Sequence, residues 1–123
     1  MEESWGSAVF ELFNVANGRE YEAIYREALR GHVSKESWTV RNLRLEHKAL
    51  RRLARFYKEV WEPFALQNGL RSDASIWRVK TPDDYEDWIR RYSNEVLQPG
   101  EVGELYYDGK IVPYLSRRGL SQE

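Results

Sequence analysis

The sequence predicts an α+β fold: a helical hairpin plus one long central helix, then a strand, a helix and a C-terminal β-hairpin forming a small antiparallel sheet. Apolar residues recur at helical spacing over the first half of the chain. A β-rich stretch follows at 75–80, and the turn pair Asp108-Gly109 lies between two short apolar runs. With 123 residues, the chain is expected to form a single compact domain over 1–123.

The N-terminal region is predicted to form two short amphipathic helices. The first covers residues 4–16 and ends at the stop signal Asn17-Gly18. The second covers residues 19–30 and ends at Gly31, so we expect the two helices to fold back on each other as a hairpin. The β-forming residues of 9–15 leave a strand as the alternative for that stretch.

The strongest pattern predicts a long helix from Ser34, as the N-cap, to about Leu66. Its apolar positions share one face: Trp38, Leu45, Ala49, Leu53, Phe56, Tyr57, Val60 and Phe64. The opposite face collects seven cations within an arc of roughly 120°: Arg41, Arg44, Lys48, Arg51, Arg52, Arg55 and Lys58. Because Pro63 lacks an amide hydrogen, we expect a kink or an end near 58–62.

The C-terminal half is predicted to contain the sheet. Residues 75–80 are assigned to a strand, and Thr81-Pro82 to the start of a helix, with threonine as N-cap. The strands at 104–107 and 110–115 flank the turn, and 116–123 is expected to be a frayed tail. No internal repeat is evident.

The composition excludes several classes of function. The chain has no cysteine, which rules out disulfides, a thiol nucleophile and a thiolate metal site. Its two histidines, His32 and His47, cannot form a histidine-rich metal site, and we expect no metal or cofactor. No apolar run reaches the ~18–20 residues of a membrane span. The N-terminus is acidic rather than signal-like, so the expectation is a cytoplasmic protein without membrane contact.

The net charge of −1 hides a separation of charge along the chain. Residues 38–58 carry seven Lys or Arg and one acid, whereas 73–108 carry nine acids and four bases. The favoured interpretation is a non-enzymatic protein whose basic helix face contacts nucleic acid or another polyanion. One alternative is a regulator or inhibitor, of the kind phages and mobile elements encode, that binds an acidic protein surface. In a second alternative, the basic face contacts the acidic segment 83–87 of the same chain or of a second copy, as in a homodimer. In a third, the basic face is simply exposed to solvent.

Two other features are candidates for function. Glu46 falls on the apolar face of the long helix, where a carboxylate needs a partner. A buried structural hydrogen bond is the favoured interpretation, and a catalytic acid or base acting with His47 or His32 is the alternative. Neighbouring tyrosines in a strand point to opposite faces, so at least one of Tyr106 and Tyr107 is predicted to face away from the core. Together with Tyr114, these side chains are predicted to form an aromatic contact for a partner, or else to cover an edge strand.

Overall fold

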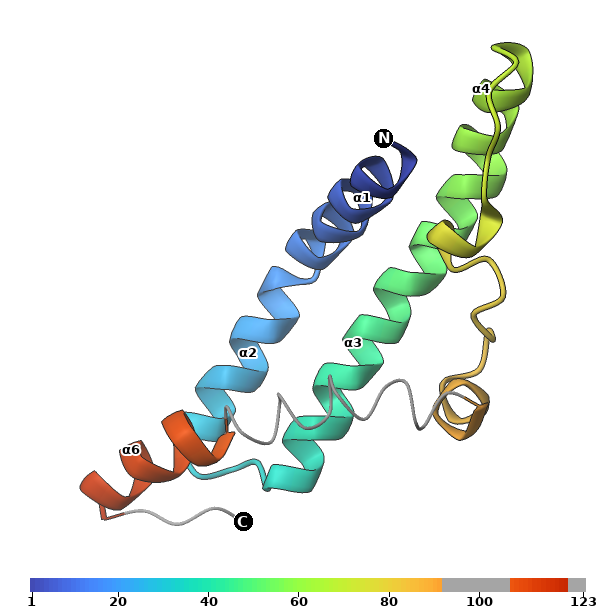
Figure 1. The fold of residues 1–123 in the computed structure, drawn as a ribbon. Coiled ribbons are helices and arrows are strands. Elements are labelled where there is room, and N and C mark those ends of the chain that lie inside the picture. Colours follow the sequence, from blue (N-terminus) through green and yellow to red (C-terminus); the bar gives the residue numbers. More distant parts are fainter. Residues whose placement is uncertain (92–106, 120–123) are drawn as a thin grey trace.

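The computed structural model describes residues 1–91 and 107–119, and these residues contain helices but no strand. The expected α+β fold is therefore wrong for the described part of the chain. Figure 1 shows two long helical rods that run antiparallel to each other. The first rod joins α1 (Glu2–Ala16) to α2 (Gly18–Leu29), and the second joins α3 (Lys35–Phe56), a π-helical turn (Tyr57–Trp61) and α4 (Glu62–Gln67). Over these residues, none of the helices is long and apolar enough to cross a bilayer.

The junction between α1 and α2 is a single residue, Asn17, rather than the turn of a hairpin. Its amide donates to the carbonyl of Asn14 at 3.0 Å, and its carbonyl accepts from the amide of Tyr21 at 3.0 Å. The helical hydrogen-bond pattern therefore continues through the junction almost without interruption. The fully buried side chain donates through Nδ2 to the carbonyl of Leu45 at 3.1 Å, which ties the junction to α3. The expected hairpin of 4–16 against 19–30 is wrong, and the fold-back occurs between α2 and α3 (Figure 1).

The two ends of α3 form as the sequence indicates. The hydroxyl of Ser34 accepts from the amide of Ser37 at 3.1 Å, which confirms the N-cap. At the other end, the amide of Glu62 donates to the carbonyl of Tyr57, five residues back, which defines the π-helical turn. Pro63 follows immediately, so the structure has a π-helical turn that leads on into α4 where the sequence predicts a kink or an end near 58–62.

The stretch assigned to a strand at 75–80 instead begins with a 3-10 helix, Ala74–Trp77. The carboxylate of Asp73 accepts from the amide of Ser75 at 3.0 Å and starts this turn. Trp77 is fully buried, and Arg78 then takes a left-handed backbone conformation with φ 54°. A local side-chain cap has thus overridden the alternation of apolar residues.

The expected β-hairpin is also replaced by helix. Residues Tyr107–Ile111 form a second π-helical turn, and α6 (Val112–Arg117) continues through part of the predicted tail. Tyr107, Ile111 and Leu115 are all buried, and their spacing of four residues places them on one helical face. That burial outweighs the turn preference of Asp108-Gly109. Residues 104–106 of the predicted strand lie outside the described residues.

The helix that the sequence predicts to start at Thr81-Pro82 starts later, at residue 85, and is described as far as residue 91. The carboxylate of Asp84 accepts from the amide of Asp87 at 3.0 Å, so Asp84 is the capping residue and Thr81 is not. The carbonyl of Pro82 accepts from Nε2 of His47 at 2.7 Å, which holds this segment against α3.

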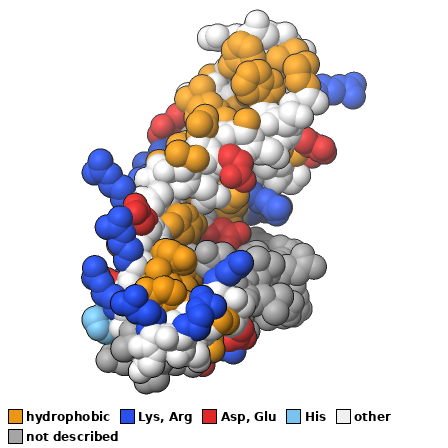
Figure 2. Space-filling view, turned by 90° about the vertical axis from the view of Figure 1, so that its left-hand side faces the viewer, with side chains coloured by type: hydrophobic (Ala, Val, Ile, Leu, Met, Phe, Trp, Pro, Cys, Tyr) orange, Lys and Arg blue, Asp and Glu red, His pale blue; other side chains and the backbone are white. Residues whose placement is uncertain are grey.

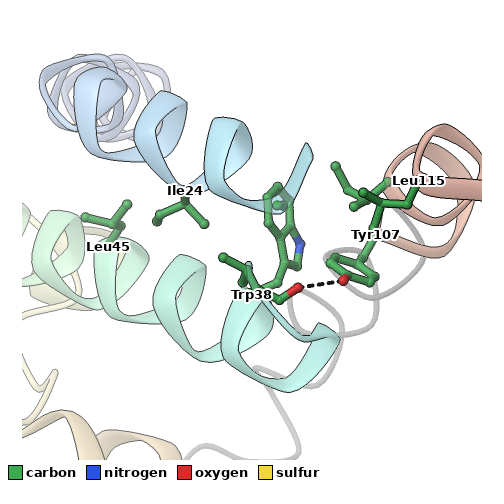
Figure 3. Packing of buried hydrophobic residues seen from close by; sticks show 8 residues of the cluster. Ile24, Trp38, Leu45, Tyr107 and Leu115 are labelled. Atoms are coloured by element: carbon green, nitrogen blue, oxygen red, sulfur yellow. Dashed lines mark hydrogen bonds between the residues drawn. The ribbon is translucent and has the colours of Figure 1, made fainter. Parts of the chain in front are cut away.

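Among the residues that the structure describes, buried hydrophobic side chains form two clusters, one in each half of the pair of antiparallel rods. The first lies between α2, α3 and the 107–115 segment, where the ring centroids of Trp38 and Tyr107 are 5.9 Å apart (Figure 3). The hydroxyl of Tyr107 donates to the carbonyl of Val33 at 2.6 Å across this cluster. The second lies between α1, the end of α3 and the 3-10 helix, with Trp77 at its centre.

The two π-helical turns belong to a motif that occurs twice, contrary to the expectation of no repeat. Each copy has a buried tyrosine, a proline at the second position of a six-residue helix and a glycine with positive φ. Each of these residues in the second copy lies 50 positions after its counterpart in the first, as 107 − 57 = 50 shows for the tyrosines. The first copy is Tyr57–Gly69 and the second is Tyr107–Gly119. The correspondence extends upstream to the capping residues Ser34 and Asp84 and to the buried Trp38 and Trp88. The same local chemistry therefore builds both segments.

Close approach of α1 to the 3-10 helix depends on Gly6. A Cβ at this position would lie 2.9 Å from Cγ2 of Ile76, a methyl group on the branched Cβ of that residue, so one of the two must shift. We expect Gly6→Ala to lower the unfolding free energy by about 1 kcal/mol, because the clash exceeds the gain in helix propensity. Gly18→Ala is the matched control, since nothing lies within 4 Å of its Cβ and it should be neutral or stabilising. Urea unfolding of both variants measures the difference, and equal midpoints would contradict the close contact.

Candidate nucleic-acid interface

The seven cations predicted to form a binding surface on α3 are at least partly exposed, but several are paired within the chain. On the side facing α2, Nη1 of Arg41 lies 2.7 Å from a carboxylate oxygen of Glu27. Nζ of Lys48 lies 3.5 Å from a carboxylate oxygen of Glu20. The pKa of Glu27 is lowered, mainly by its hydrogen bond and charge interaction with Arg41. Helix α2 thus neutralises one edge of the predicted surface.

The other edge of the predicted surface faces the acidic segment before and within the 85–91 helix. Nη2 of Arg44 lies 3.2 Å from Glu86, and its guanidinium lies 4.3 Å from the ring centroid of Tyr85. Nη2 of Arg51 lies 3.1 Å from Asp83. These are the ion pairs that the intramolecular alternative expects of segment 83–87. Exposed pairs of this kind contribute roughly 0–1 kcal/mol, so they organise the surface more than they stabilise it.

Three cations of the set remain. Arg52 lies near Glu20, whose pKa is lowered chiefly by its own backbone hydrogen bond and less by the neighbouring cations. Arg55 and Lys58 are exposed, and within the described residues neither forms an ion pair. The basic face of α3 is therefore not a continuous row of unpaired charges that could follow a phosphate backbone.

Glu46 is only half-buried, and the described residues provide no hydrogen bond to its carboxylate, so the expected structural hydrogen bond is not found. Burial raises the pKa of Glu46, while the positive charge of Arg78 opposes that rise. His47, its neighbour in sequence, is buried and packs between Tyr85 and Trp88, with ring centroids 5.9 and 5.1 Å away. With Nε2 bonded to a carbonyl, His47 has a structural role in this arrangement.

Of the three tyrosines proposed as an aromatic contact, Tyr107 and Tyr114 belong to the described residues and have different exposures. Tyr106 lies outside the described residues. Tyr107 is fully buried in the first hydrophobic cluster, because it lies on the inward face of a helical turn and not on a strand, so it offers no contact surface. Tyr114 is half-buried on α6, and the guanidinium of Arg118 lies 5.7 Å from its ring centroid.

Tyr114 belongs to a basic hollow that sequence reasoning missed. The hollow, of about 390 Å³, lies where the end of α2 meets α6. Three arginines and a histidine from two distant parts of the chain surround it, with two side chains supplying an apolar floor: Arg26, Arg30, His32 and Arg118, with Leu29 and Tyr114. Figure 2 shows Lys and Arg side chains gathered over the lower half of this face of the molecule.

Local backbone chemistry explains the position of these cations. Arg30 is the C-cap of α2 and Arg118 the C-cap of α6, and the negative end of a helix dipole favours cations there. Gly31, with φ 79°, turns the chain out of α2, and the amide of His32 then donates to the carbonyl of Glu27 at 3.1 Å. The basic residues at both helix ends were visible in the sequence. Their convergence was not, because 110–115 was assigned to a strand.

Few acidic side chains oppose this cluster. Glu22 pairs with Arg26 at 2.7 Å, but both side chains are mostly exposed and the pair lies within one helix. Glu27 pairs with Arg41 and also interacts, more weakly, with the charges of His32 and Arg30. Within the described residues, Arg30 and Arg118 form no ion pair. Arg118 therefore lies beside the Tyr114 ring, and Arg30 lines the same hollow, and neither is held in an ion pair by another described residue, so the hollow can attract an anion.

Comparisons with protein-family models, with curated proteins and with solved structures give no significant match to this chain.

Proposed function

We propose that the protein binds single-stranded nucleic acid through the basic hollow between α2 and α6. The observation that supports the proposal is the convergence of Arg26, Arg30 and Arg118 around the ring of Tyr114. Proteins that bind single strands combine cations that follow the phosphates with aromatic rings on which bases stack. The hollow supplies both elements, whereas the α3 surface has cations that are largely paired with acids.

The chemistry of the hollow suits a nucleotide. Arginine presents a planar fork of donors that matches a phosphate group, and it also stacks on aromatic faces. A base would lie against Leu29 and Tyr114, while Arg30 and Arg118 would contact phosphates on either side. The overall charge of −1 opposes non-specific coating of a long duplex, so we expect a short site on a single strand.

The test is the affinity for a fluorescent single-stranded oligonucleotide, measured by anisotropy at several salt concentrations. With three arginines in contact, the affinity should fall about twentyfold between ~50 and ~200 mM salt. The double variant Arg30→Ala/Arg118→Ala should weaken binding at least about tenfold and flatten the salt dependence. Tyr114→Ala should also weaken binding, because stacking on an aromatic side chain contributes about 1–3 kcal/mol per base.

A matched control removes two cations elsewhere. Arg55→Ala/Lys58→Ala has the same change in charge, and both residues are exposed on the second rod. This variant should bind as the wild type does. Equal loss in both double variants would show that total charge, and not the hollow, drives binding. Absence of binding by the wild-type chain at low salt would overturn the proposal.

A second candidate function is contact with another protein, as in the regulator interpretation. Hydrophobic side chains gather at the end of the molecule formed by α4 (Figure 2). The exposed fractions there are 50% for Val60, 48% for Phe64 and 75% for Leu66. Exposed apolar groups of this kind are typical of protein interfaces. This alternative gains support if the oligonucleotide is not bound.

A further inference from the structure

A cleft of about 880 Å³ lies between the N-terminal half of α1, the middle of α3 and residues 74–81. It shares no lining residue with the basic hollow. Its volume falls within the range of about 300–1,000 Å³ that is usual for small-molecule sites. Its walls are largely apolar, with Leu50 and Leu53 on α3, Ile76 opposite and the buried Trp88 at one side.

Charged side chains of both signs line this cleft. Glu46 comes from α3 and Glu3 from α1, whereas Arg78 and Lys80 come from the 74–81 segment. The carboxylate of Glu46 is half-buried, has no hydrogen-bond partner among the described residues and feels the charge of Arg78. The two groups nevertheless form no ion pair within 4 Å. A half-buried carboxylate without a partner is costly, so it favours a ligand that brings a cation.

The backbone at Arg78 is held in an unusual conformation. Within the described residues, it is the one non-glycine residue with positive φ, at 54°. Its amide donates to the carbonyl of Ser75 at 3.2 Å, and its carbonyl accepts from the amide of Thr81 at 3.0 Å. Such strain concentrates at ligand sites, where the surrounding structure fixes a side chain that the site needs.

We propose that the cleft binds an apolar α-amino acid as its zwitterion. The ammonium group lies at Glu46, the carboxylate lies at Arg78 and Lys80, and the side group lies on Leu50, Leu53 and Trp88. An amino acid carries its two charges a short distance apart, and can therefore bridge a carboxylate and a guanidinium that do not touch. A ligand with a single charge would leave one of the two groups without a partner.

The first test uses the wild-type chain and three probes in titration calorimetry. The probes are L-phenylalanine, phenylalaninamide, which lacks the carboxylate, and N-acetylphenylalanine, which lacks the ammonium group. We expect each modified probe to bind at least about tenfold more weakly than phenylalanine. Absence of phenylalanine binding at millimolar concentration overturns the proposal. Equal binding of either modified probe also overturns it, because the site then recognises one charge only.

Two variants assign each charge to its partner. In Glu46→Gln, phenylalanine and N-acetylphenylalanine should bind alike, because the partner of the ammonium group is gone. In Arg78→Gly, phenylalanine and phenylalaninamide should bind within a few-fold of each other, with Lys80 left as the remaining cation. Arg55→Ala, which lies outside the cleft, should bind all three probes as the wild type does. If either variant discriminates between the probes as the wild type does, the assignment of that charge is wrong.

Both variants are expected to fold. Burial disfavours the charged form of Glu46, so glutamine should leave the thermal midpoint at pH 7 unchanged or higher. Glycine adopts positive φ without strain, so Arg78→Gly should be no less stable than the wild type. The comparison of probes on the wild-type chain needs neither variant, so the proposal stays testable if one of them unfolds.

Discussion

Replacing Trp77 with alanine should lower the unfolding free energy by about 3–5 kcal/mol. Trp77 is fully buried at the centre of the second hydrophobic cluster. Its ring centroid lies 5.1 Å from that of Trp61, 5.8 Å from Phe56 and 6.1 Å from Tyr57. Removing the ring loses its burial and leaves a cavity beside these three aromatic rings, and both effects lower stability.

Urea unfolding followed by circular dichroism measures this effect. Trp5→Ala is the matched control, because 53% of the Trp5 side chain is exposed on α1, and its loss should change stability by no more than about 0.5 kcal/mol. Trp77→Phe should fall between the two. It keeps an aromatic ring but removes the Nε1 donor that lies 2.8 Å from a carboxylate oxygen of Glu2. A loss below about 1 kcal/mol in Trp77→Ala would contradict the central position of this ring.

Tyr107→Ala should lower the unfolding free energy by a similar amount, about 3–5 kcal/mol. Tyr107 is fully buried and, together with the ion pair of Asp108 and Lys35, connects the C-terminal segment to the turn between α2 and α3. Its ring packs against Trp38, and its hydroxyl donates to the carbonyl of Val33. Tyr107→Phe keeps the ring but leaves that carbonyl without its donor, which should cost about 1–3 kcal/mol.

The difference between the two Tyr107 variants separates packing from hydrogen bonding. Tyr114→Phe serves as the control, because Tyr114 is half-buried and the same loss of a hydroxyl should there be close to neutral. Thermal unfolding of the three variants gives the comparison. If Tyr107→Phe is as stable as the wild type, the hydrogen bond to Val33 contributes nothing to stability.

The long helices were predictable from local information. The N-cap at Ser34, the stop at Gly31 and the disturbance around Pro63 act within a few residues of each other, so spacing and capping rules locate them. The direction of the chain after α1 was not predictable in the same way. Asn17-Gly18 is a plausible stop, but the buried hydrogen bond from Asn17 to Leu45 comes from a residue far along the chain and keeps the two helices end to end.

The strand and the β-hairpin were wrong for a physical reason. Short apolar runs fit a period of two and a period of four almost equally well, and the hydrophobic neighbours decide between them. At Tyr107, Ile111 and Leu115, burial against α2 and α3 selected the helical period. The tertiary contact thus overrode the preference of Asp108-Gly109 for a tight turn.

The candidate site shows the same limit. Six of the seven predicted cations lie on α3, and Lys58 lies on the π-helical turn that follows, but a sequence cannot show that Glu27 and Asp83 approach this face from other elements. The basic hollow needs Arg30 and Arg118 from two helices that meet only in the folded chain. Charge counted along a sequence therefore overestimates a surface that the fold neutralises, and it misses one that the fold assembles.

The two π-helical turns make the orientation of the helices that follow them sensitive to insertions and deletions. The turn Tyr57–Trp61 amounts to one extra residue wound into an otherwise α-helical path, and the turn Tyr107–Ile111 leads directly into α6. Deleting one residue within Tyr57–Trp61 would rotate α4 by ~100° about its axis and draw it back by ~1.5 Å. Ala65 would then leave the core, and the same change within Tyr107–Ile111 would displace Leu115. Most loops tolerate a change in length of one residue, but here such a change would reorient a whole helix. The length of these two turns therefore determines which faces of α4 and α6 are buried.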